Sequence, residues 1–462
     1  MSDKNHSFLK SYVKGEVLLG GWGIVAKLLG AVNAFIIISN LEVFKYGVYI
    51  LVLSVYSIFS GFFLKSLIGV IFNDISRFLA KGDESSAKKL YLENFKFRVF
   101  SSLFLSLFLF FGANIVADFY DQDVASLFRI LSPLFLIDAF YSSMKILFRA
   151  RLKFGLIAFR PIVYKSLKLV TMLYFIYFTS FGMQEAFIAH IGASFVAMII
   201  FIPSFIKLYN PWKNITTAKD KIMLRIVRTY GKWSLFSQSL SRSTADIRLW
   251  IIKFFINTEA VAVFSVAESL YGALKGLFPT ATLAALIPHE IHDKQRSKKI
   301  LIRGTKYLFI IAMIFVAVGF FIVSPGITIV FPQYADSVPL FQVLLLALFA
   351  LSFRSIGTAF LVALRRQKYL FYINTVYIIL GLLLPVILLH FFGLFGMAFE
   401  RVIISVVIGT LIYWRIAKKE IKISLSKDFF TYNKDDRIFF KKLFLESSKR
   451  VKKLFFIAKH GK

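Results

Sequence analysis

The 462-residue sequence contains no cysteine, six histidines and only 25 acidic residues against 57 lysines and arginines. A chain without cysteine can form no disulfide, no thiolate nucleophile and no Cys-ligated metal site. The histidines are scattered without the spacing of a metal site. No glycine-rich Walker loop is present, so ATP is not an evident energy source. We therefore expect neither a metal nor a cofactor.

Apolar residues, by contrast, are in large excess. They make up 58% of the chain, with 55 phenylalanines, above the roughly 45–50% that is typical of soluble domains. Apolar runs of about 20 residues, long enough to cross a bilayer, recur along almost the whole sequence. This pattern predicts an all-α polytopic membrane protein. The net charge of +32 lies in alternate loops, which favours cytoplasmic loops over a nucleic-acid partner.

Twelve apolar segments predict twelve transmembrane helices. They cover residues 15–39, 47–72, 97–118, 124–148, 156–178, 185–206, 231–252, 258–286, 305–330, 337–362, 368–390 and 393–415. Basic connecting segments alternate with short neutral or acidic ones, so both termini are predicted to be cytoplasmic. The longest internal linker, 207–230, divides the chain into six-helix bundles at 1–206 and 231–416. A weak internal similarity at a shift of about 215 residues predicts parallel repeats.

The segment 231–252 has the length of a membrane span but is polar along one side. Ser234, Gln238, Arg242 and Asp246 recur at helical spacing and form one stripe. A charge at the centre of a bilayer costs at least about 2.5–3.5 kcal/mol. The stripe is therefore expected to face a water-filled cavity or a protein partner.

The C-terminal segment 417–462 is a separate feature. Its apolar residues fit one face of a helix, with lysines opposite. This pattern is typical of a basic amphipathic helix on the inner leaflet, and it predicts anionic membrane lipids as a partner.

Cations inside predicted spans could bind an anionic substrate, because Arg and Lys pair with phosphate oxygens. The candidates for substrate binding are Arg242, Lys27, Arg248, Arg354, Lys165 and Lys275. Lys27 and Arg242 rank first because they fall at matching positions of the two halves. Each could instead neutralise a buried carboxylate. For Lys165 and Lys275, snorkelling to the inner interface is an equal alternative, and for Lys168 it is the favoured interpretation.

Three carboxylates lie within predicted spans, and no catalytic residue is assigned. The ion-coupling candidates are Asp138, Glu268 and Asp246. A lone buried carboxylate is suited to carry a proton or to bind a cation. Two structural alternatives stay open: Asp246 could pair with Arg242 one turn away, and Asp138 could pair with Lys27 or Lys165 of a neighbouring helix.

The entry to the second predicted span carries a family resemblance. There, Tyr46, Gly47 and Tyr49 form a Tyr-Gly-x-Tyr turn that resembles the bacterial polysaccharide-repeat flippases. These are the Wzx-type O-antigen and capsule transporters of the MOP superfamily, which also contains MATE exporters and lipid II flippases. Ala262 and Phe264 stand where this family has Gly and Tyr at the entry to its eighth span. Further similarity lies at 261–267, 333–335 and 393–398.

The resemblance implies two six-helix bundles around a cationic central cavity, the MOP fold. Twelve spans fit this group better than lipid II flippases, which usually have fourteen. The implied function is to flip an undecaprenyl-diphosphate-linked oligosaccharide repeat unit to the outer leaflet of the bacterial inner membrane, during O-antigen and lipopolysaccharide synthesis. Polysaccharide polymerases are then candidate partners.

Two other functions compete with this interpretation. A MATE-like, cation-coupled exporter of small amphipathic molecules would need an acidic cavity, whereas cations outnumber carboxylates here. An enzyme is the third possibility, because Asp121 and Asp123 match a DxD motif. The predicted outer segments are too short for an acceptor site, so we expect no enzyme. The adjacent Glu400 and Arg401 receive no role from the sequence.

Overall fold

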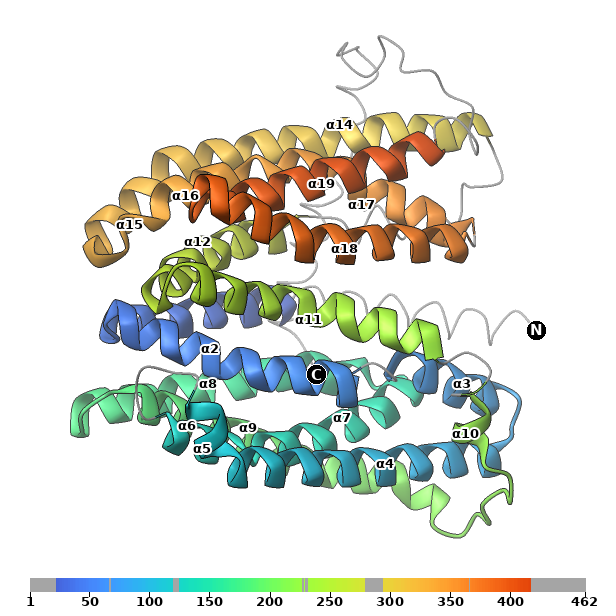
Figure 1. The fold of residues 1–462 in the computed structure, drawn as a ribbon. Helices are drawn as coiled ribbons and strands as arrows, with labels where there is room; N and C mark the ends of the chain where they lie inside the picture. The colour runs from blue at the N-terminus through green and yellow to red at the C-terminus, as the bar shows by residue number, and fades with distance from the viewer. Residues whose placement is uncertain are drawn as a thin grey trace, which may run out of the picture. The chain divides into compact units, whose positions relative to one another are not determined.

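The computed structural model describes residues 22–65, 68–118, 124–226, 228, 232–278, 294–364 and 366–416. Within these ranges the chain is helical, as the sequence predicts. The predicted amphipathic tail at 417–462 lies outside them. The chain divides into two compact units, Met1–Trp250 and Ile251–Lys462, and the boundary lies inside helix α11 (Lys232–Phe255) (Figure 1). The sequence places the boundary earlier, at the linker 207–230, and those bundle limits stay a prediction.

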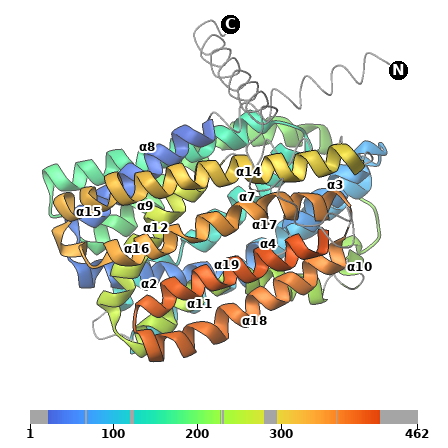
Figure 2. The same ribbon diagram turned by 90° about the horizontal axis from the view of Figure 1, so that it is seen from above.

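Unit 1 is a bundle of long helices joined by short turns. Besides most of α11, its helices are Trp22–Asn40, α2 (Val43–Ser60), α3 (Ile68–Ala80), α4 (Glu84–Phe111), α5 (Ala113–Ala117), α6 (Ala125–Leu131), α7 (Leu134–Ala150), α8 (Phe154–Phe178), α9 (Met183–Tyr209) and α10 (Ile222–Ile226). Helix α4 packs along α3 and α7, and α9 packs along α8 and α7 (Figures 1 and 2). Pro133 stands between α6 and α7, which together form one bent span over Ala125–Ala150.

The predicted basic connecting segment at 73–96 is mostly helical, because helices α3 and α4 occupy most of it. Ile71, Ile75 and Leu90 are fully buried in one core cluster of this region. Lys88 of α4 is buried as well, at 8% exposure, whereas Lys81 in the turn between the two helices is exposed. Asp83 caps α4 by accepting a hydrogen bond from the Ser86 backbone N–H at 2.9 Å. That bond holds the pKa of the Asp83 carboxyl below its ordinary value.

The limits of two predicted spans differ from the limits of the helices in the structure. Helix α4 begins well before the predicted start at 97 and ends at Phe111. Helix α14 (Lys294–Val318) begins before the predicted start at 305. Apolar runs locate the part of a helix that lies in lipid, whereas backbone hydrogen bonding continues into the polar turns beyond it.

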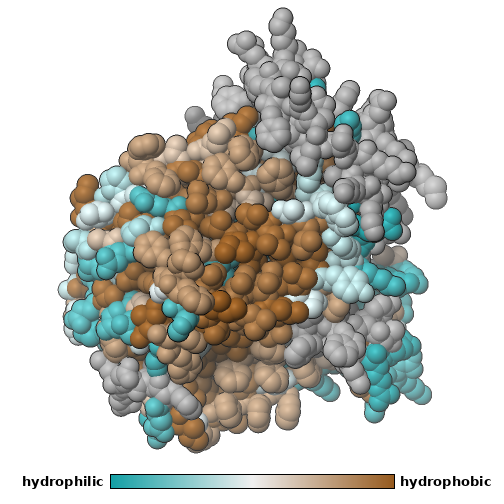
Figure 3. Space-filling model, turned by 45° about the horizontal axis from the view of Figure 1, so that its top comes forward, coloured by the Kyte–Doolittle hydropathy of each residue, from teal (hydrophilic) through white to brown (hydrophobic). Residues whose placement is uncertain are grey.

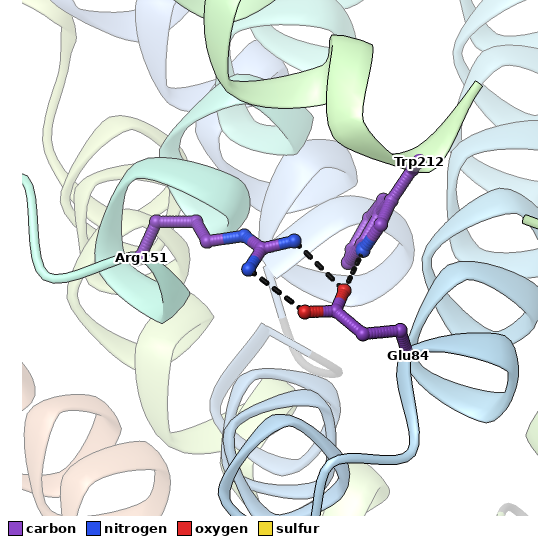
Figure 4. A network of polar contacts seen from close by, with 3 residues as sticks. All are labelled: Glu84, Arg151 and Trp212. Atoms are coloured by element: carbon purple, nitrogen blue, oxygen red, sulfur yellow. Dashed lines mark hydrogen bonds and ion pairs between the residues drawn. The ribbon is translucent and has the colours of Figure 1, made fainter. Parts of the chain in front are cut away.

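A polar clamp fastens the linker after α9 to the rest of unit 1 (Figure 4). Glu84 at the start of α4 forms a two-pronged ion pair with Arg151, at 3.0 and 2.8 Å. The indole N–H of Trp212 donates to the same carboxylate. Nearby, the Lys88 ammonium donates to the Ile215 carbonyl at 2.7 Å. The described part of the linker is therefore ordered on unit 1 up to α10.

Unit 2 is also a helix bundle. Besides the end of α11, its helices are α12 (Thr258–Gly276), α14 (Lys294–Val318), α15 (Ser324–Val330), α16 (Ser337–Leu345), α17 (Ala347–Ala363), α18 (Gln367–Phe392) and α19 (Phe395–Arg415). Helix α19 packs against both α17 and α18 (Figures 1 and 2). The core contains Phe341, Phe360 and Ile408, all at most 1% exposed. Gly357 allows close contact, since a Cβ there would lie 2.3 Å from Cγ2 of Ile412.

Nine helices within the described ranges are long and apolar enough to cross a membrane. Helices α8, α11 and α12 lie at the three other predicted positions, and they carry most of the candidate site residues. The count of twelve spans therefore stays a prediction. Large apolar side chains are exposed on the surface, among them Phe100, Phe111, Phe321 and Ile329. Figure 3 shows a broad hydrophobic area between hydrophilic margins, as expected of a surface in contact with lipid.

Candidate functional site

The predicted cations of unit 1 lie in unlike surroundings. Lys165 donates from its ammonium group to the Ala26 carbonyl at 2.6 Å, so it joins α8 to the helix Trp22–Asn40. Lys27 on that same helix is exposed. Arg248 is only 3% exposed within α11. The side chain of Arg242 lies outside the described residues, and so does its predicted pairing with Asp246.

Snorkelling of Lys168, the favoured interpretation from the sequence, is wrong. The side chain is 7% exposed, and its ammonium group donates to the Tyr49 hydroxyl at 3.4 Å. The Tyr49 ring in turn packs against Phe187, with centroids 4.8 Å apart. The lysine is held inside the helix bundle because it finds a polar partner there.

The three carboxylates each have a polar partner. Asp138 accepts a hydrogen bond from the Tyr56 hydroxyl and lies within electrostatic range of Arg98. Asp246 accepts from the Ser57 hydroxyl at 2.7 Å. Glu268 forms an ion pair with Arg401. The described surroundings of Asp138 thus contain a tyrosine and an arginine where the sequence suggested Lys27 or Lys165.

Unit 2 contains a small pocket that gathers several of these charges. It is lined by Tyr271, Lys275, Leu351, Arg354, Tyr377, Arg401, Ile404 and Ser405. The lining residues come from α12 and from the three consecutive helices α17, α18 and α19. Two of the predicted substrate-binding cations, Lys275 and Arg354, meet here, although they are separated by almost eighty positions.

Aromatic rings stand beside two of the pocket cations. The Arg354 guanidinium lies 5.6 Å from the ring centroid of Tyr377. The Lys275 ammonium lies 5.9 Å from that of Tyr271. A ring face attracts a cation without neutralising it. The aromatic contacts therefore stabilise both cations beside the pocket and leave their positive charges in place.

The pocket carries an excess of positive charge. Lys275, Arg354 and Arg401 are its three cations, and Glu268 is the carboxylate paired with one of them. Three positive charges and one negative charge sum to +2. Side chains of this kind bind phosphate oxygens by charge-assisted hydrogen bonds. No group of His, Cys, Asp and Glu that could hold a metal ion occurs among the described residues.

Sequence reasoning missed the contributions of Arg401, Tyr271 and Tyr377. Arg401 follows Glu400 directly, and a neighbouring opposite charge suggests local neutralisation. The structure instead buries Glu400 to 1% exposure, while Arg401 lines the pocket. One available signal was the rule that an ionisable residue inside a membrane span is functional by default.

Comparison with protein families gives one match by sequence. The family model described as lipid II flippase MurJ matches residues 115–438, well over half of the chain. This interval contains every residue of the unit 2 pocket. The comparison with curated protein sequences found no significant match.

Several solved structures share the fold. A multidrug resistance MATE family transporter of the MOP superfamily, in its inward-facing conformation, has 15% sequence identity and a TM-score of 0.70, covering 87% of this chain and 96% of its own. Lipid II flippase MurJ in an inward closed conformation has 13% identity and a TM-score of 0.68, covering 93% of each chain. A mutant of the Vibrio cholerae MATE transporter VcmN has 16% identity and a TM-score of 0.59, covering 92% and 99%.

At such identities the structural likeness shows the fold alone, and the family comes from the sequence match. The fold is the all-helical membrane fold of MATE transporters and MurJ. These relatives are transporters, which excludes the DxD-type enzyme considered from the sequence. The protein is a multi-pass membrane transporter that belongs to the lipid II flippase MurJ family.

Proposed function

We propose that the protein moves a polyprenyl-diphosphate-linked glycan across the membrane, and that the unit 2 pocket binds its diphosphate. The observation that carries this proposal is the net charge of +2 formed by Lys275, Arg354, Arg401 and Glu268. A diphosphate esterified at both ends carries one negative charge on each phosphate, so its charge matches that of the pocket. Arg354 and Arg401 offer the planar N–H donors that suit phosphate oxygens.

The glycan that we propose is an oligosaccharide repeat unit linked to undecaprenyl diphosphate. It would pass from the cytoplasmic to the outer leaflet of the bacterial inner membrane. The family match favours lipid II, whose carrier is the same. The Tyr-Gly-x-Tyr turn at 46–49 favours the repeat unit instead. Both substrates are lipid-linked precursors, and a direct comparison of their flipping rates distinguishes them.

The other candidates keep narrower roles in this proposal. Lys27 and Arg242 remain proposed contacts for the substrate, since Lys27 is exposed and could reach it. Lys165 we now propose to be structural, because its ammonium group is bonded to the Ala26 carbonyl. Arg248 stays a proposed contact. The basic tail at 417–462 is proposed to bind anionic lipids, and polysaccharide polymerases remain proposed partners.

Export of small amphipathic molecules is the second candidate function. The fold likeness to a multidrug resistance MATE transporter favours it. Many such molecules are cations, however, and the pocket in unit 2 would repel them. We therefore place this function second.

Flipping of a labelled undecaprenyl-diphosphate oligosaccharide in proteoliposomes tests the proposal. We expect Arg354→Gln and Lys275→Gln to slow the initial flipping rate about tenfold or more. Each removes a charge-assisted bond to phosphate, of about 1.5–3 kcal/mol. Lys45→Gln is the matched control, because Lys45 pairs with Glu42 on the exposed surface of unit 1. Its rate should equal that of the wild type.

The same vesicles distinguish the alternatives. If lipid II is flipped faster than the repeat unit, lipid II is the preferred substrate and the proposed glycan is wrong. The assignment of the pocket as the diphosphate site would not change. Equal rates for the wild type and both pocket variants would overturn the assignment of the pocket. Transport of an organic cation on a proton or sodium gradient, with no lipid flipping, would support the exporter. The variants Lys27→Ala and Arg242→Ala test the remaining contacts in one series.

A further inference from the structure

We propose that Glu268 limits how tightly the pocket holds its anion, so that the diphosphate can leave after it has crossed. This inference rests on the proposed function, because it concerns the same pocket. Arg401 is the shared partner of Glu268 and of the proposed substrate. Glu268 therefore sets the strength of binding through a residue that contacts the diphosphate.

The placement of the ion pair supports this role. The Arg401 guanidinium lines the pocket, whereas Glu268 contacts Arg401 and is not itself a lining residue. The guanidinium thus contacts the carboxylate and also lines the pocket. The side chains are partly accessible, at 17% exposure for Arg401 and 27% for Glu268.

The charges around Glu268 come from every element of the pocket. Helix α12 contributes Lys275 and Tyr271, α17 contributes Arg354, α18 contributes Tyr377, and α19 contributes Arg401. Glu268 forms an ion pair with the lining residue Arg401, and the buried Glu400 precedes Arg401 on α19. If Glu268 were neutral, the three lining cations would exceed the charge of a doubly charged diphosphate by one. A carrier that binds too tightly releases slowly, so the carboxylate favours turnover over affinity.

The arrangement also links anion binding to proton binding. A diphosphate beside Arg401 and an ionised Glu268 repel one another, because both are negative. Protonation of Glu268 removes this repulsion and strengthens anion binding. By thermodynamic reciprocity, a bound diphosphate favours the protonated form of Glu268 to the same extent. A neutral side chain at position 268 should therefore bind the diphosphate more tightly than an ionised glutamate.

Binding of an undecaprenyl-diphosphate-linked oligosaccharide to the purified full-length protein in detergent tests the inference, with the flipping assay alongside. We expect Glu268→Gln to lower the Kd about tenfold at pH 7.5 and to slow flipping at saturating substrate. Glu268→Asp keeps the charge and should keep the Kd of the wild type. Glu42→Gln, which removes an exposed carboxylate of unit 1, should behave as the wild type.

Each outcome decides between the two proposals. If the lipid-linked oligosaccharide binds the wild type and Arg354→Gln equally, the pocket is not its site and both proposals fall. If Arg354→Gln weakens binding but Glu268→Gln weakens it too, Glu268 merely positions Arg401 and this inference alone is overturned. Should Glu268→Gln fail to fold, Glu268→Ala is the second neutral variant. A Kd of that variant below the Kd of the wild type supports the inference, and an equal or higher Kd overturns it.

Discussion

At the scale of single residues, unit 1 buries charges that must be compensated inside the bundle. Arg98 is 1% exposed and donates to the Ser142 hydroxyl at 2.7 Å and to the Asn94 side chain at 3.1 Å. Asp138 supplies the nearby negative charge and accepts a hydrogen bond from Tyr56. Burying a charge is costly unless it is paired and hydrogen-bonded. These contacts favour a structural role for Asp138 over ion coupling.

We expect Asp138→Asn to destabilise the protein by about 1.5–3 kcal/mol, because it removes the charged acceptor of the Tyr56 hydrogen bond and a negative charge within electrostatic range of Arg98. Tyr56→Phe removes only one hydrogen bond to the same carboxylate and should cost about 1–3 kcal/mol. Thermal unfolding in detergent measures both. If Asp138→Asn instead abolished flipping while unfolding at the wild-type temperature, Asp138 would be a coupling residue.

At the scale of helices, the turn between α18 and α19 depends on two glycines. Gly393 has a φ of 54°, which a residue with a side chain rarely adopts. At Gly396 a Cβ would lie 2.2 Å from the Leu388 carbonyl oxygen, which belongs to the backbone of α18. The two helices therefore approach closely at their joined ends. Helix α19 carries Arg401, so this approach also positions the pocket.

Gly396→Ala should lower the stability of the protein by at least about 1–3 kcal/mol, because the added methyl group meets backbone that cannot move aside. Gly192→Ala is the matched control, since a Cβ at Gly192 in α9 would meet no atom within 4 Å. Alanine is the better helix former, so this control should be neutral or slightly stabilising. Equal unfolding temperatures for the two variants, measured in the same detergent, would contradict the close approach.

The element scale also shows where sequence patterns reach their limit. Helix positions follow from apolar runs, and helices stand at all twelve predicted places. The ends of α4 and α14 cannot be predicted from apolar runs, because both helices extend beyond their apolar part into polar turns. The pairing of Glu84 with Arg151 and Trp212 was equally hidden, since it joins the ends of three helices.

At the scale of the whole molecule, charge asymmetry is the basis of the predicted orientation. The basic segments, such as the one that includes Lys81, are predicted to face the cytoplasm. The turn after α8, which includes Ser180, belongs to the short segments that are predicted to face outward. Both residues are exposed. The absence of cysteine makes the natural chain a clean background for single-cysteine labelling.

We expect a membrane-impermeant maleimide to label Ser180→Cys from outside the cytoplasmic membrane, in cells whose outer barrier has been opened. Lys81→Cys should react only after that membrane is permeabilised, because a charged reagent does not cross its hydrocarbon core. The unaltered chain, which has no thiol, gives the background. Labelling of both positions from the same side would refute the alternation on which the twelve-span topology rests.

The sequence by itself determined the all-helical membrane architecture and the positively charged character of the molecule. Both properties depend on local sequence and composition alone. Apolar runs determine which helices lie in lipid, and the numbers of charged residues determine the net charge. Only the tertiary structure decided which charges meet. Glu268 and Arg401 are 133 positions apart, and Lys275 and Arg354 come together from α12 and α17. Such contacts depend on how helices rotate and pack against one another, which local spacing does not encode.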